Sequence, residues 1–254
     1  MEKSQVSDHS TFGIKSGNFR RRLKAIVYQN GGDLFGVADL EPARGFIIAQ
    51  GGETLIKYPR AISIGIRLSD EIIDQHSPDE SHENSLYWHH VYRVVTPALD
   101  SLALRIQREL QADGSMALPI PTSLPYNRET LKSVFSHKLA AHLSGLGWIG
   151  KNCLLITPDF GPRVRFVTIL TDAPLPSGIP LNEKCGKCQS CVVACPVQAF
   201  KGVEFKSTDD VEARFDTWAC EGYRRTHPCG ICVARCPAGR PADSGFPTAN
   251  TREP

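Results

Sequence analysis

The sequence predicts an α+β fold in which an α/β domain is followed by a small cysteine-rich module. Helix-like and strand-like apolar patterns alternate up to Asp172, a Pro- and Gly-rich segment follows at 174–180, and eight of the nine cysteines come after it. The 254 residues are 41% hydrophobic and 22% charged, a composition typical of globular proteins with a hydrophobic core. We therefore divide the chain into a first domain of residues 1–176, a module of residues 177–240 and a tail of residues 241–254.

The first domain begins with a helix and two strands. Apolar residues at helical spacing predict a helix over 19–30, which ends at a Gly-Gly pair, and a short apolar run predicts a strand over 34–38. Alternating apolar and small residues predict a second strand over 61–66. Residues 69–85 are rich in Asp, Glu, Ser and His, and we expect them to form a mobile loop.

The longest expected helix runs from Tyr87 to Gly114, because apolar residues recur along one of its faces. Pro97 should bend it, since proline removes a helical hydrogen bond. Three prolines then mark an extended connection over 119–125, and residues 129–144 are expected to be helical again.

Two further strands are expected over 153–157 and 164–171, joined as a hairpin around Gly161 and Pro162. Cys153, the one cysteine outside the later arrays, lies at the start of the first of them. We expect it to be a small buried hydrophobe, the alternative being a ligand or redox group.

Charge and hydropathy narrow the possible partners and location. The net charge is +2, so no basic excess indicates a nucleic-acid partner. No stretch approaches the roughly 18 consecutive apolar residues of a membrane helix, and the polar residues 1–18 lack the apolar core of a signal peptide. The run Arg20 to Arg22 is expected at a solvated helix start. Reduced cysteines are typical of the cytosol, so we expect a cytoplasmic protein.

The eight clustered cysteines form two arrays, C-x2-C-x2-C-x3-C-P and C-x8-C-x2-C-x3-C-P. The first is the run of bacterial two-cluster ferredoxins, in which three thiolates bind one [4Fe–4S] cluster and the fourth crosses to the other. Thr226 stands where a regular second array would begin, so Cys220 must supply that ligand. Crossing then assigns the ligands of cluster I as Cys185, Cys188, Cys191 and Cys236, and those of cluster II as Cys195, Cys220, Cys229 and Cys232.

The module is therefore predicted to be ferredoxin-like and to hold two [4Fe–4S] clusters. Structural zinc is an alternative, although zinc favours paired C-x2-C knuckles that bind as separate tetrahedra. Disulfides are a second alternative that suits small secreted domains. If clusters are bound, the backbone amides of Gly186, Gly222 and Gly230 are expected to donate hydrogen bonds to their sulfurs.

Residues 145–152 form the motif GLGWIGKN, which is followed by two expected strands and the double array. With these features the chain resembles the epoxyqueuosine reductases over residues 136–237 and, in architecture, the wider group of cobalamin-dependent reductive dehalogenases. The resemblance implies that the first domain is nitroreductase-like and holds cobalamin or another corrinoid beside the cluster module. It implies five cofactor-binding residues: Gly147, Trp148, Gly150, Lys151 and Asn152.

Elementary chemistry allows two interpretations of this GLGWIGKN motif. Glycines let the backbone approach a large flat ligand, and Lys151 could then bind a propionamide or phosphate oxygen. The alternative is a tight helix-to-strand turn with Trp148 in the core.

The chain departs from the epoxyqueuosine reductases in two ways. The family has an aspartate proton donor about fourteen residues before the motif, whereas Leu131, Lys132 and Ser133 stand there in this chain. His137 is one candidate substitute, the alternative being a histidine on the helix surface. The family also continues past the last cysteine into a helical-repeat region that helps bind tRNA, while few residues follow Pro237 here. We therefore expect weak epoxyqueuosine reductase activity.

The favoured hypothesis is a redox protein that passes low-potential single electrons to a cobalt corrinoid. The corrinoid would be bound by the protein itself or presented by a partner corrinoid protein. One alternative is a substrate-reducing cobalamin enzyme of the epoxyqueuosine reductase type, and another is a plain ferredoxin-type carrier with a docking domain. We expect an oxidoreductase with a redox partner protein, and expect neither nucleic acid nor membrane as a partner. The sequence assigns no catalytic residue.

Overall fold

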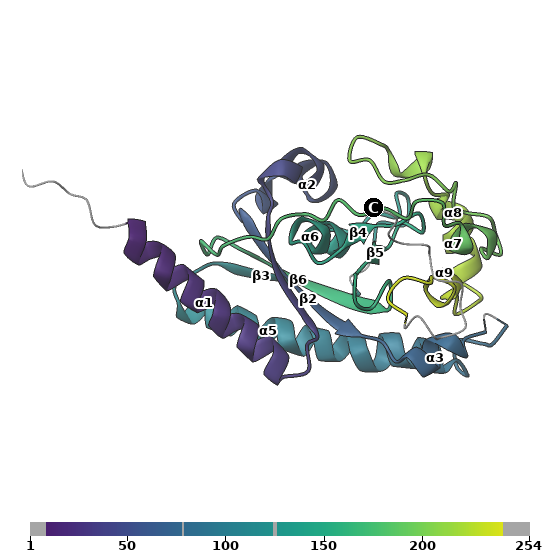
Figure 1. Ribbon diagram of the computed structural model, residues 1–254, viewed down its shortest axis with the longest axis horizontal. Coiled ribbons are helices and arrows are strands. Elements are labelled where there is room, and N and C mark those ends of the chain that lie inside the picture. The colour runs from purple at the N-terminus through teal and green to yellow at the C-terminus, as the bar shows by residue number, and fades with distance from the viewer. Residues whose placement is uncertain (1–8, 78, 124–125, 241–254) are drawn as a thin grey trace, which may run out of the picture.

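A four-stranded antiparallel sheet forms the centre of the first domain in the computed structural model, which describes residues 9–77, 79–123 and 126–240 (Figure 1). Its strands follow the order β1-β2-β6-β3. They are β1 (Leu34–Asp39), β2 (Arg60–Arg67), β6 (Val164–Thr171) and β3 (Ala117–Ile120). The expected tail of residues 241–254 and Pro125 lie outside the described residues.

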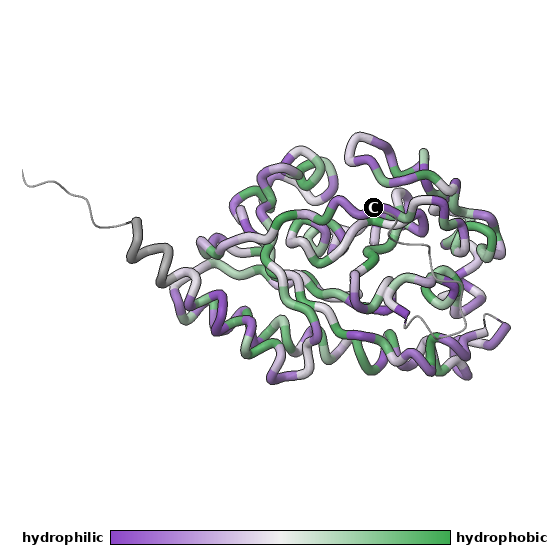
Figure 2. The backbone as a smooth tube through the Cα atoms, viewed as in Figure 1, coloured by the Kyte–Doolittle hydropathy of each residue, from purple (hydrophilic) through white to green (hydrophobic). Residues whose placement is uncertain are grey.

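The sheet is held by strand pairs whose buried side chains are β-branched. Val37 pairs with Ile62, which pairs in turn with Ile169, and all three side chains are fully buried. Such pairs fit a pleated surface that is covered on both faces. Figure 2 shows the corresponding hydrophobic colour along the central strands. The strands expected over 34–38, 61–66 and 164–171 are therefore confirmed.

Helices cover both faces of the sheet (Figure 1). The helices α1 (His9–Gln29) and α5 (Thr96–Ala112) contact each other, and α5 also contacts β6. The helices α2 (Arg44–Gly51) and α6 (His137–Leu143) lie on the other side, where Ile47, Phe135 and Ala140 share one hydrophobic cluster. Mixed α and β structure is thus confirmed for the first domain.

The long helix expected from Tyr87 is present but irregular. It consists of α4 (Leu86–Trp88), a π-helical segment over His89–Val95, and α5. Pro97 lies in the first turn of α5, where its missing N–H costs little. The Thr96 hydroxyl donates a hydrogen bond to the Val91 carbonyl at 2.9 Å. Pro97 therefore marks a change of helix type within a continuous helical stretch.

Helix boundaries were wrong in two places. Part of the loop expected over 69–85 is helix α3 (Asp70–Asp74), which Ser69 caps by accepting a hydrogen bond from the Ile72 amide and which buries Ile73. Conversely, residues 129–136 are not helical, and α6 begins only after the capping residue Ser136.

Strand pairing also differs from the expectation. The short strand β5 (Leu155–Ile156) pairs with β4 (Trp148–Ile149) in a separate two-stranded sheet. It does not form a hairpin with β6, which joins the central sheet. The connection expected over 119–125 begins within strand β3, which ends at Ile120. Proline is tolerated at Pro119 because β3 is an edge strand.

The cysteine-rich module lies at one end of the sheet (Figure 1). It contains the short helices α7 (Ser190–Val193), α8 (Thr217–Arg224) and α9 (Ile231–Ala234). Short 3-10 turns complete the described elements at Glu41–Ala43, Glu53–Leu55 and Val211–Ala213. Helix α9 contacts α7 and also α3 of the first domain.

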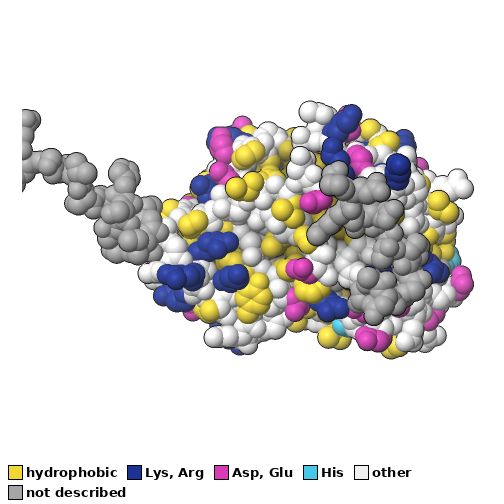
Figure 3. All heavy atoms as spheres, in the orientation of Figure 1, with side chains coloured by type: hydrophobic (Ala, Val, Ile, Leu, Met, Phe, Trp, Pro, Cys, Tyr) yellow, Lys and Arg dark blue, Asp and Glu magenta, His cyan; other side chains and the backbone are white. Residues whose placement is uncertain are grey.

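Basic side chains are prominent along α1. Figure 3 shows Lys and Arg side chains gathered at the α1 end of the molecule. Arg20, Arg21 and Arg22 lie within α1, not at its start, and Arg22 pairs with Glu109 at 3.3 Å. Within the described part of the chain, no helix has both the length and the apolar character needed to cross a membrane.

Candidate iron–sulfur and cofactor site

Four cysteines from both ends of the module lie together as the ligand set predicted for cluster I. Burial raises the pKa of Cys191 to about 12, and the neighbouring Cys236, Cys185 and Cys188 add to this increase. Burial likewise raises the pKa of Cys236 to about 11, with Cys185 and Cys188 acting in the same direction. Such mutual influence requires short distances between the sulfur atoms. Cys236 of the second array therefore lies near the cysteines of the first array, as the crossing assignment expects.

The other four cysteines form the set predicted for cluster II. Burial raises the pKa of Cys220 to about 11 against the opposing effect of Arg224, and Cys229 and Cys195 raise it further. The pKa of Cys232 is raised by burial first and then by Cys229 and Cys220. The irregularly spaced Cys220 thus lies where the missing ligand was expected.

These buried thiols are suited to iron–sulfur clusters. A cluster binds the thiolate form of cysteine, so each thiol must lose its proton when iron binds. Without iron, burial favours the protonated thiol. Several backbone amides already favour the thiolates, and the Ala199 N–H donates to Cys195 Sγ at 3.3 Å. The described His, Cys, Asp and Glu side chains include no group of three or more that could hold a single metal ion.

One of the expected amide donors is engaged elsewhere. The Gly230 N–H donates to His76 Nε2 at 3.0 Å and is not available to a cluster sulfur. In its place the neighbouring Ile231 amide favours the Cys229 thiolate, although burial raises the pKa of that thiol overall. A donor role for Gly186 and Gly222 stays a prediction.

The glycines of the GLGWIGKN motif serve close packing of the backbone. A Cβ atom on Gly147 would lie 2.2 Å from the carbonyl oxygen of Ile156 in β5. A Cβ atom on Gly145, which has φ +80°, would lie 2.4 Å from the Ile179 carbonyl oxygen. Gly150 is similarly close to the Ile156 side chain. The glycines therefore bring neighbouring segments together in a tight turn, while Trp148 is half-buried instead of lying in the core. Cofactor binding by this motif stays a prediction.

Lys151 and Asn152 join the first domain to the cluster module. The Lys151 side chain is 5% exposed, and its Nζ donates to the carbonyls of Gly186 at 2.6 Å and Cys188 at 3.1 Å. Asn152 Nδ2 donates to the Cys232 carbonyl at 3.4 Å. The structure thus directs the Lys151 ammonium to the cluster I loop, and a contact of these two residues with a corrinoid stays a prediction.

Trp148 lies beside Cys185. Burial raises the pKa of Cys185, while the Lys151 backbone N–H and the Trp148 indole N–H act in the opposite direction. The indole Nε1 is nevertheless buried without a well-formed hydrogen bond. A sulfur atom of a bound cluster would supply an acceptor, so this orphaned donor fits a cluster at this position.

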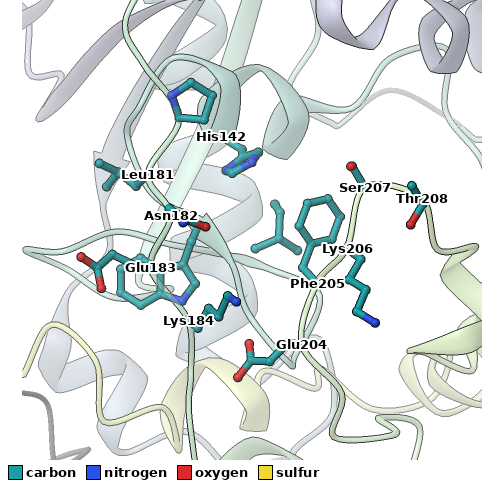
Figure 4. A pocket seen from close by; sticks show the side chains of 13 residues that line it. His142, Leu181, Asn182, Glu183, Lys184, Glu204, Phe205, Lys206, Ser207 and Thr208 are labelled. Atoms are coloured by element: carbon teal, nitrogen blue, oxygen red, sulfur yellow. The ribbon is translucent and has the colours of Figure 1, made fainter.

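A cavity of about 500 Å³ adjoins cluster I (Figure 4). It is lined by His142, Trp148, Ile149 and the segments 180–184 and 204–208. Of the five residues predicted to bind a cofactor, only Trp148 lines it. The segments 180–184 and 204–208 escaped the sequence analysis because they belong to irregular loops without a motif.

Two of the cavity residues contact the cluster I ligand Cys185. The Trp148 indole favours its thiolate, and Glu204 Oε2 accepts a hydrogen bond from its backbone N–H at 3.4 Å. Figure 4 shows Glu204 and Lys184 at the opposite end of the cavity from His142. The cavity is therefore separated from cluster I by single side chains.

His142 presents one ring nitrogen to the cavity. Its Nδ1 lies 3.1 Å from the Gly147 carbonyl oxygen, which only accepts hydrogen bonds, so Nδ1 carries a proton. Its ring meets Phe205 edge-on, with centroids 5.7 Å apart. Nε2 is left for a ligand, and the hydrogen bond fixes the ring orientation. Sequence analysis passed over His142; its place in the last turn of α6, next to the motif, was the available signal.

His137 does not reach the cavity. Its Nδ1 lies 2.9 Å from Thr168 Oγ1 and its Nε2 lies 3.2 Å from the Pro121 carbonyl. Burial lowers the pKa of His137 to about 4, so the ring is neutral near pH 7. Both ring nitrogens are thus engaged within the protein, which disfavours a role as proton donor, and the side chain is partly buried.

Cys153 is buried, as expected, with 3% exposure. Burial raises the pKa of its thiol. The guanidinium of Arg214 lies 3.6 Å from its sulfur, and Lys138 Nζ donates to its carbonyl at 2.7 Å. The residue has φ +55° at the turn between β4 and β5. It is therefore a packed thiol, and its side-chain partner Arg214 belongs to neither ligand set.

Comparison with known proteins supports the cluster assignment. The family model for the 4Fe-4S dicluster domain matches residues 184–240. The epoxyqueuosine reductase of Bacillus anthracis is 32% identical over 116 residues, which cover 42% of this chain and 30% of that protein. The tetrachloroethene reductive dehalogenase of Desulfitobacterium hafniense is 35% identical over 111 residues, covering 37% of this chain and 20% of that protein. The chain therefore spans less than a third of the length of these relatives.

Solved structures share the fold. The catabolic reductive dehalogenase NpRdhA aligns with 89% of this chain and 32% of its own, with a TM-score of 0.66 and 21% identity. Epoxyqueuosine reductase from Streptococcus thermophilus aligns with 88% of this chain and 67% of its own, with a TM-score of 0.56 and 17% identity. At these identities the likeness shows the fold alone. Sequence match, ligand sets and fold agree: the chain carries a 4Fe-4S dicluster domain over residues 184–240 and is similar to the epoxyqueuosine reductases and the reductive dehalogenases.

Proposed function

We propose that the protein is an iron–sulfur reductase whose clusters pass single electrons to a corrinoid in the cavity, where a substrate is reduced. The observation that carries the proposal is the position of Trp148 and Glu204, which line the cavity and also contact Cys185 of cluster I. The relatives named above are reductases. This favours substrate reduction over the electron-transfer role expected first.

The cavity has features that suit a corrinoid. Its volume of about 500 Å³ lies within the ~300–1,000 Å³ typical of small-molecule sites. Trp148 and Phe205 offer flat apolar surfaces, and Asn182, Lys184 and Lys206 offer polar groups for amide side chains. One related structure is described as suggesting a mechanism for B12-dependent dehalogenation. A bound corrinoid would supply low-valent cobalt, and a nitroreductase-like first domain belongs to the same proposal.

The chain's own residues would orient the ligand and supply a proton. Reductive cleavage of a carbon–halogen bond consumes two electrons and one proton and leaves a carbon–hydrogen bond and a halide ion. Reductive removal of an epoxide oxygen consumes two electrons and two protons and leaves an alkene and water. No carboxyl group stands at Leu131, Lys132 or Ser133, and His137 is turned away. His142 Nε2 faces the cavity and is the group that we assign to proton delivery. A redox partner protein would feed electrons into the clusters from outside.

The first test is cobalamin binding by the anaerobically reconstituted protein, followed by absorbance. Gly147→Val would not test the cavity, because Gly147 faces β5 instead of the cavity. Ser207→Trp fills the cavity from the 204–208 segment, and Ser101→Trp on exposed α5 is its matched control. We expect wild type and Ser101→Trp to bind and Ser207→Trp not to bind. Absence of binding by wild type would leave a partner corrinoid protein as the electron acceptor.

The second test is turnover with a strong reductant. Suitable probes are an epoxyqueuosine-modified tRNA stem loop and a brominated hydroxybenzoate, which represent the substrate classes of the two groups of relatives. We expect weak conversion of the stem loop, because the family's proton donor is missing at 131–133. Conversion at the rate of a full-length epoxyqueuosine reductase would overturn this expectation. Binding of cobalamin without turnover of either probe would support electron transfer alone.

A further inference from the structure

Lys151 is a buried cation beside the cluster I loop, and its one carboxylate neighbour is loosely placed. Lys151 is 5% exposed, and its ammonium lies 3.8 Å from Glu204 Oε1, beyond hydrogen-bond distance. Glu204 itself is 27% exposed, and its Oε1 atom is buried without a hydrogen bond. The charge of Lys151 is therefore only partly balanced by the carboxylate.

The arginines near the same cluster differ in this respect. Arg163 lowers the pKa of Cys236, so its charge also acts on cluster I. However, Arg163 pairs with Asp74 at 3.0 Å and with Asp70 at 3.5 Å. Asp74 also pairs with Arg240, and Asp70 also pairs with Arg67, so these two carboxylates are shared among three arginines. Lys151 differs because its ammonium has one carboxylate neighbour, Glu204, and donates to two carbonyls of the cluster I loop.

Lys151 is also part of the wrapping of cluster I. Its Nζ donates to the carbonyls of Gly186 and Cys188, which belong to the loop between the ligands Cys185 and Cys188. Its backbone N–H favours the Cys185 thiolate. The same residue therefore fixes the cluster loop and places a positive charge next to it.

We propose that Lys151 is a positioning residue that raises the reduction potential of cluster I, and that Glu204 opposes it. Reduction adds one negative charge to the cluster, and a buried cation stabilises this charge more strongly than water-exposed groups do. Neutralising Lys151 removes the stabilisation. Neutralising Glu204 removes the counter-charge and has the opposite effect.

The position of cluster I gives the effect a direction. Trp148 and Glu204 line the cavity and contact the cluster I ligand Cys185, and the ligand Cys232 of cluster II lies near the cluster I ligand Cys191. An electron that enters through cluster II is then held mainly on cluster I, next to the cavity, because cluster I has the higher reduction potential. This inference rests on two parts of the proposed function: both clusters are present, and reduction takes place in the cavity.

The experiment compares Lys151→Gln and Glu204→Gln with wild type in an anaerobic redox titration followed by electron paramagnetic resonance. We expect the potential of cluster I to fall in the first variant and to rise in the second. We expect each shift in the reduction potential of cluster I to be about 59 mV, which for one electron is a tenfold change in the distribution of electrons between the clusters. Lys151→Arg should restore the wild-type potential, and Lys132→Gln, on the exposed 129–136 segment, is the matched control.

Opposite shifts separate an electrostatic role from a merely structural one. Equal potentials in Glu204→Gln and wild type would overturn the inference, as would shifts of the same sign in both variants. Iron and sulfide contents are measured in every sample. Full clusters with unchanged potentials would sink the inference and leave the proposed function intact, whereas wild type without clusters would sink the proposed function.

Discussion

At the scale of single residues, the two histidines of α6 meet different surroundings. His137 uses both ring nitrogens within the protein, at Thr168 and at the Pro121 carbonyl. His142 uses Nδ1 at the Gly147 carbonyl and leaves Nε2 for the cavity. Five positions separate them, so they lie on different faces of the helix. One therefore supports packing and the other is available for chemistry.

His142→Gln tests the proton-delivery role. We expect cobalamin binding and cluster content to stay at wild-type values, because the substitution keeps the size of the side chain. Product formation should fall by about 10²–10⁴-fold, the usual contribution of a positioned acid. The measurement is the turnover rate of the better of the two probe substrates as a function of pH. Unchanged turnover would assign the proton to another group or to water.

His137 makes stability depend on pH. Its pKa is about 4 in the folded protein, below its ordinary value of 6.5, because burial disfavours the charged ring. The unfolded chain therefore binds a proton that the folded chain does not. The free energy of unfolding is fully retained above pH 6.5 and falls as the pH drops from 6.5 towards 4.

His137→Gln should weaken this dependence. We expect wild type to lose on the order of 2 kcal/mol more than the variant across this window, since one unit of pKa corresponds to about 1.4 kcal/mol. Anaerobic urea unfolding at several pH values measures it. Parallel pH profiles for the two proteins would show that the His137 ring is accessible to protons in the fold.

At the scale of elements, periodicity identified the central strands and missed the loops between them. The buried strands β1, β2 and β6 carry short runs of apolar residues, a pattern typical of strands in the core of a sheet. Residues 129–136 were expected to be helical, yet Leu131 has φ +53° and the Asn127 side chain accepts from the Glu129 and Thr130 amides. This local capping competes with a helix and leaves no periodic signal.

The GLGWIGKN motif was located correctly, but its role differs in part from the expected one. Glycine tolerates a close backbone neighbour whether that neighbour is a ligand or another strand, so sequence alone does not separate the two. The structure shows β5 in that place. Lys151 and Asn152 point to the cluster module, and only Trp148 lines the cavity.

Gly147→Ala tests the packing role of the motif. A Cβ atom would approach the Ile156 carbonyl oxygen to 2.2 Å, so β4 and β5 must separate. We expect the free energy of unfolding to fall by about 1–3 kcal/mol, the usual cost of overpacking. Gly17→Ala in α1 is the control, because nothing lies within 4 Å of its added Cβ atom and alanine favours a helix. Equal stabilities for the two variants would contradict the close contact.

At the scale of the whole molecule, the cysteine spacing predicted the ligand sets because the covalent chain leaves few ways to share eight thiolates between two cubes. The cavity was not predictable in this way. It is formed by α6, β4 and two irregular loops that are distant in sequence and meet only in the fold. The salt bridge that joins α3 to the module was hidden for the same reason, since Asp74 and Arg240 are remote from each other in the chain.

Metal analysis tests the ligand sets. After anaerobic reconstitution we expect about eight irons and eight acid-labile sulfides per chain, because each cube needs four thiolates. Stoichiometric zinc without sulfide would contradict this. Cys195→Ala should damage cluster II, whose other ligands are Cys220, Cys229 and Cys232, and spare cluster I. Selective loss of the cluster at Cys185 would show that the ligands do not cross.

The adjacent residues Lys151 and Asn152 hold one cluster loop each, through the carbonyls of Cys188 and Cys232. Both residues are synthesised before any cysteine of the arrays, and N-terminal segments generally fold first during synthesis. The first domain is then in place as a template when the arrays leave the ribosome. We therefore expect assembly of the two clusters to depend on correct folding of the first domain. A chain that misfolds before Cys185 would present no ordered cluster sites and bind no iron.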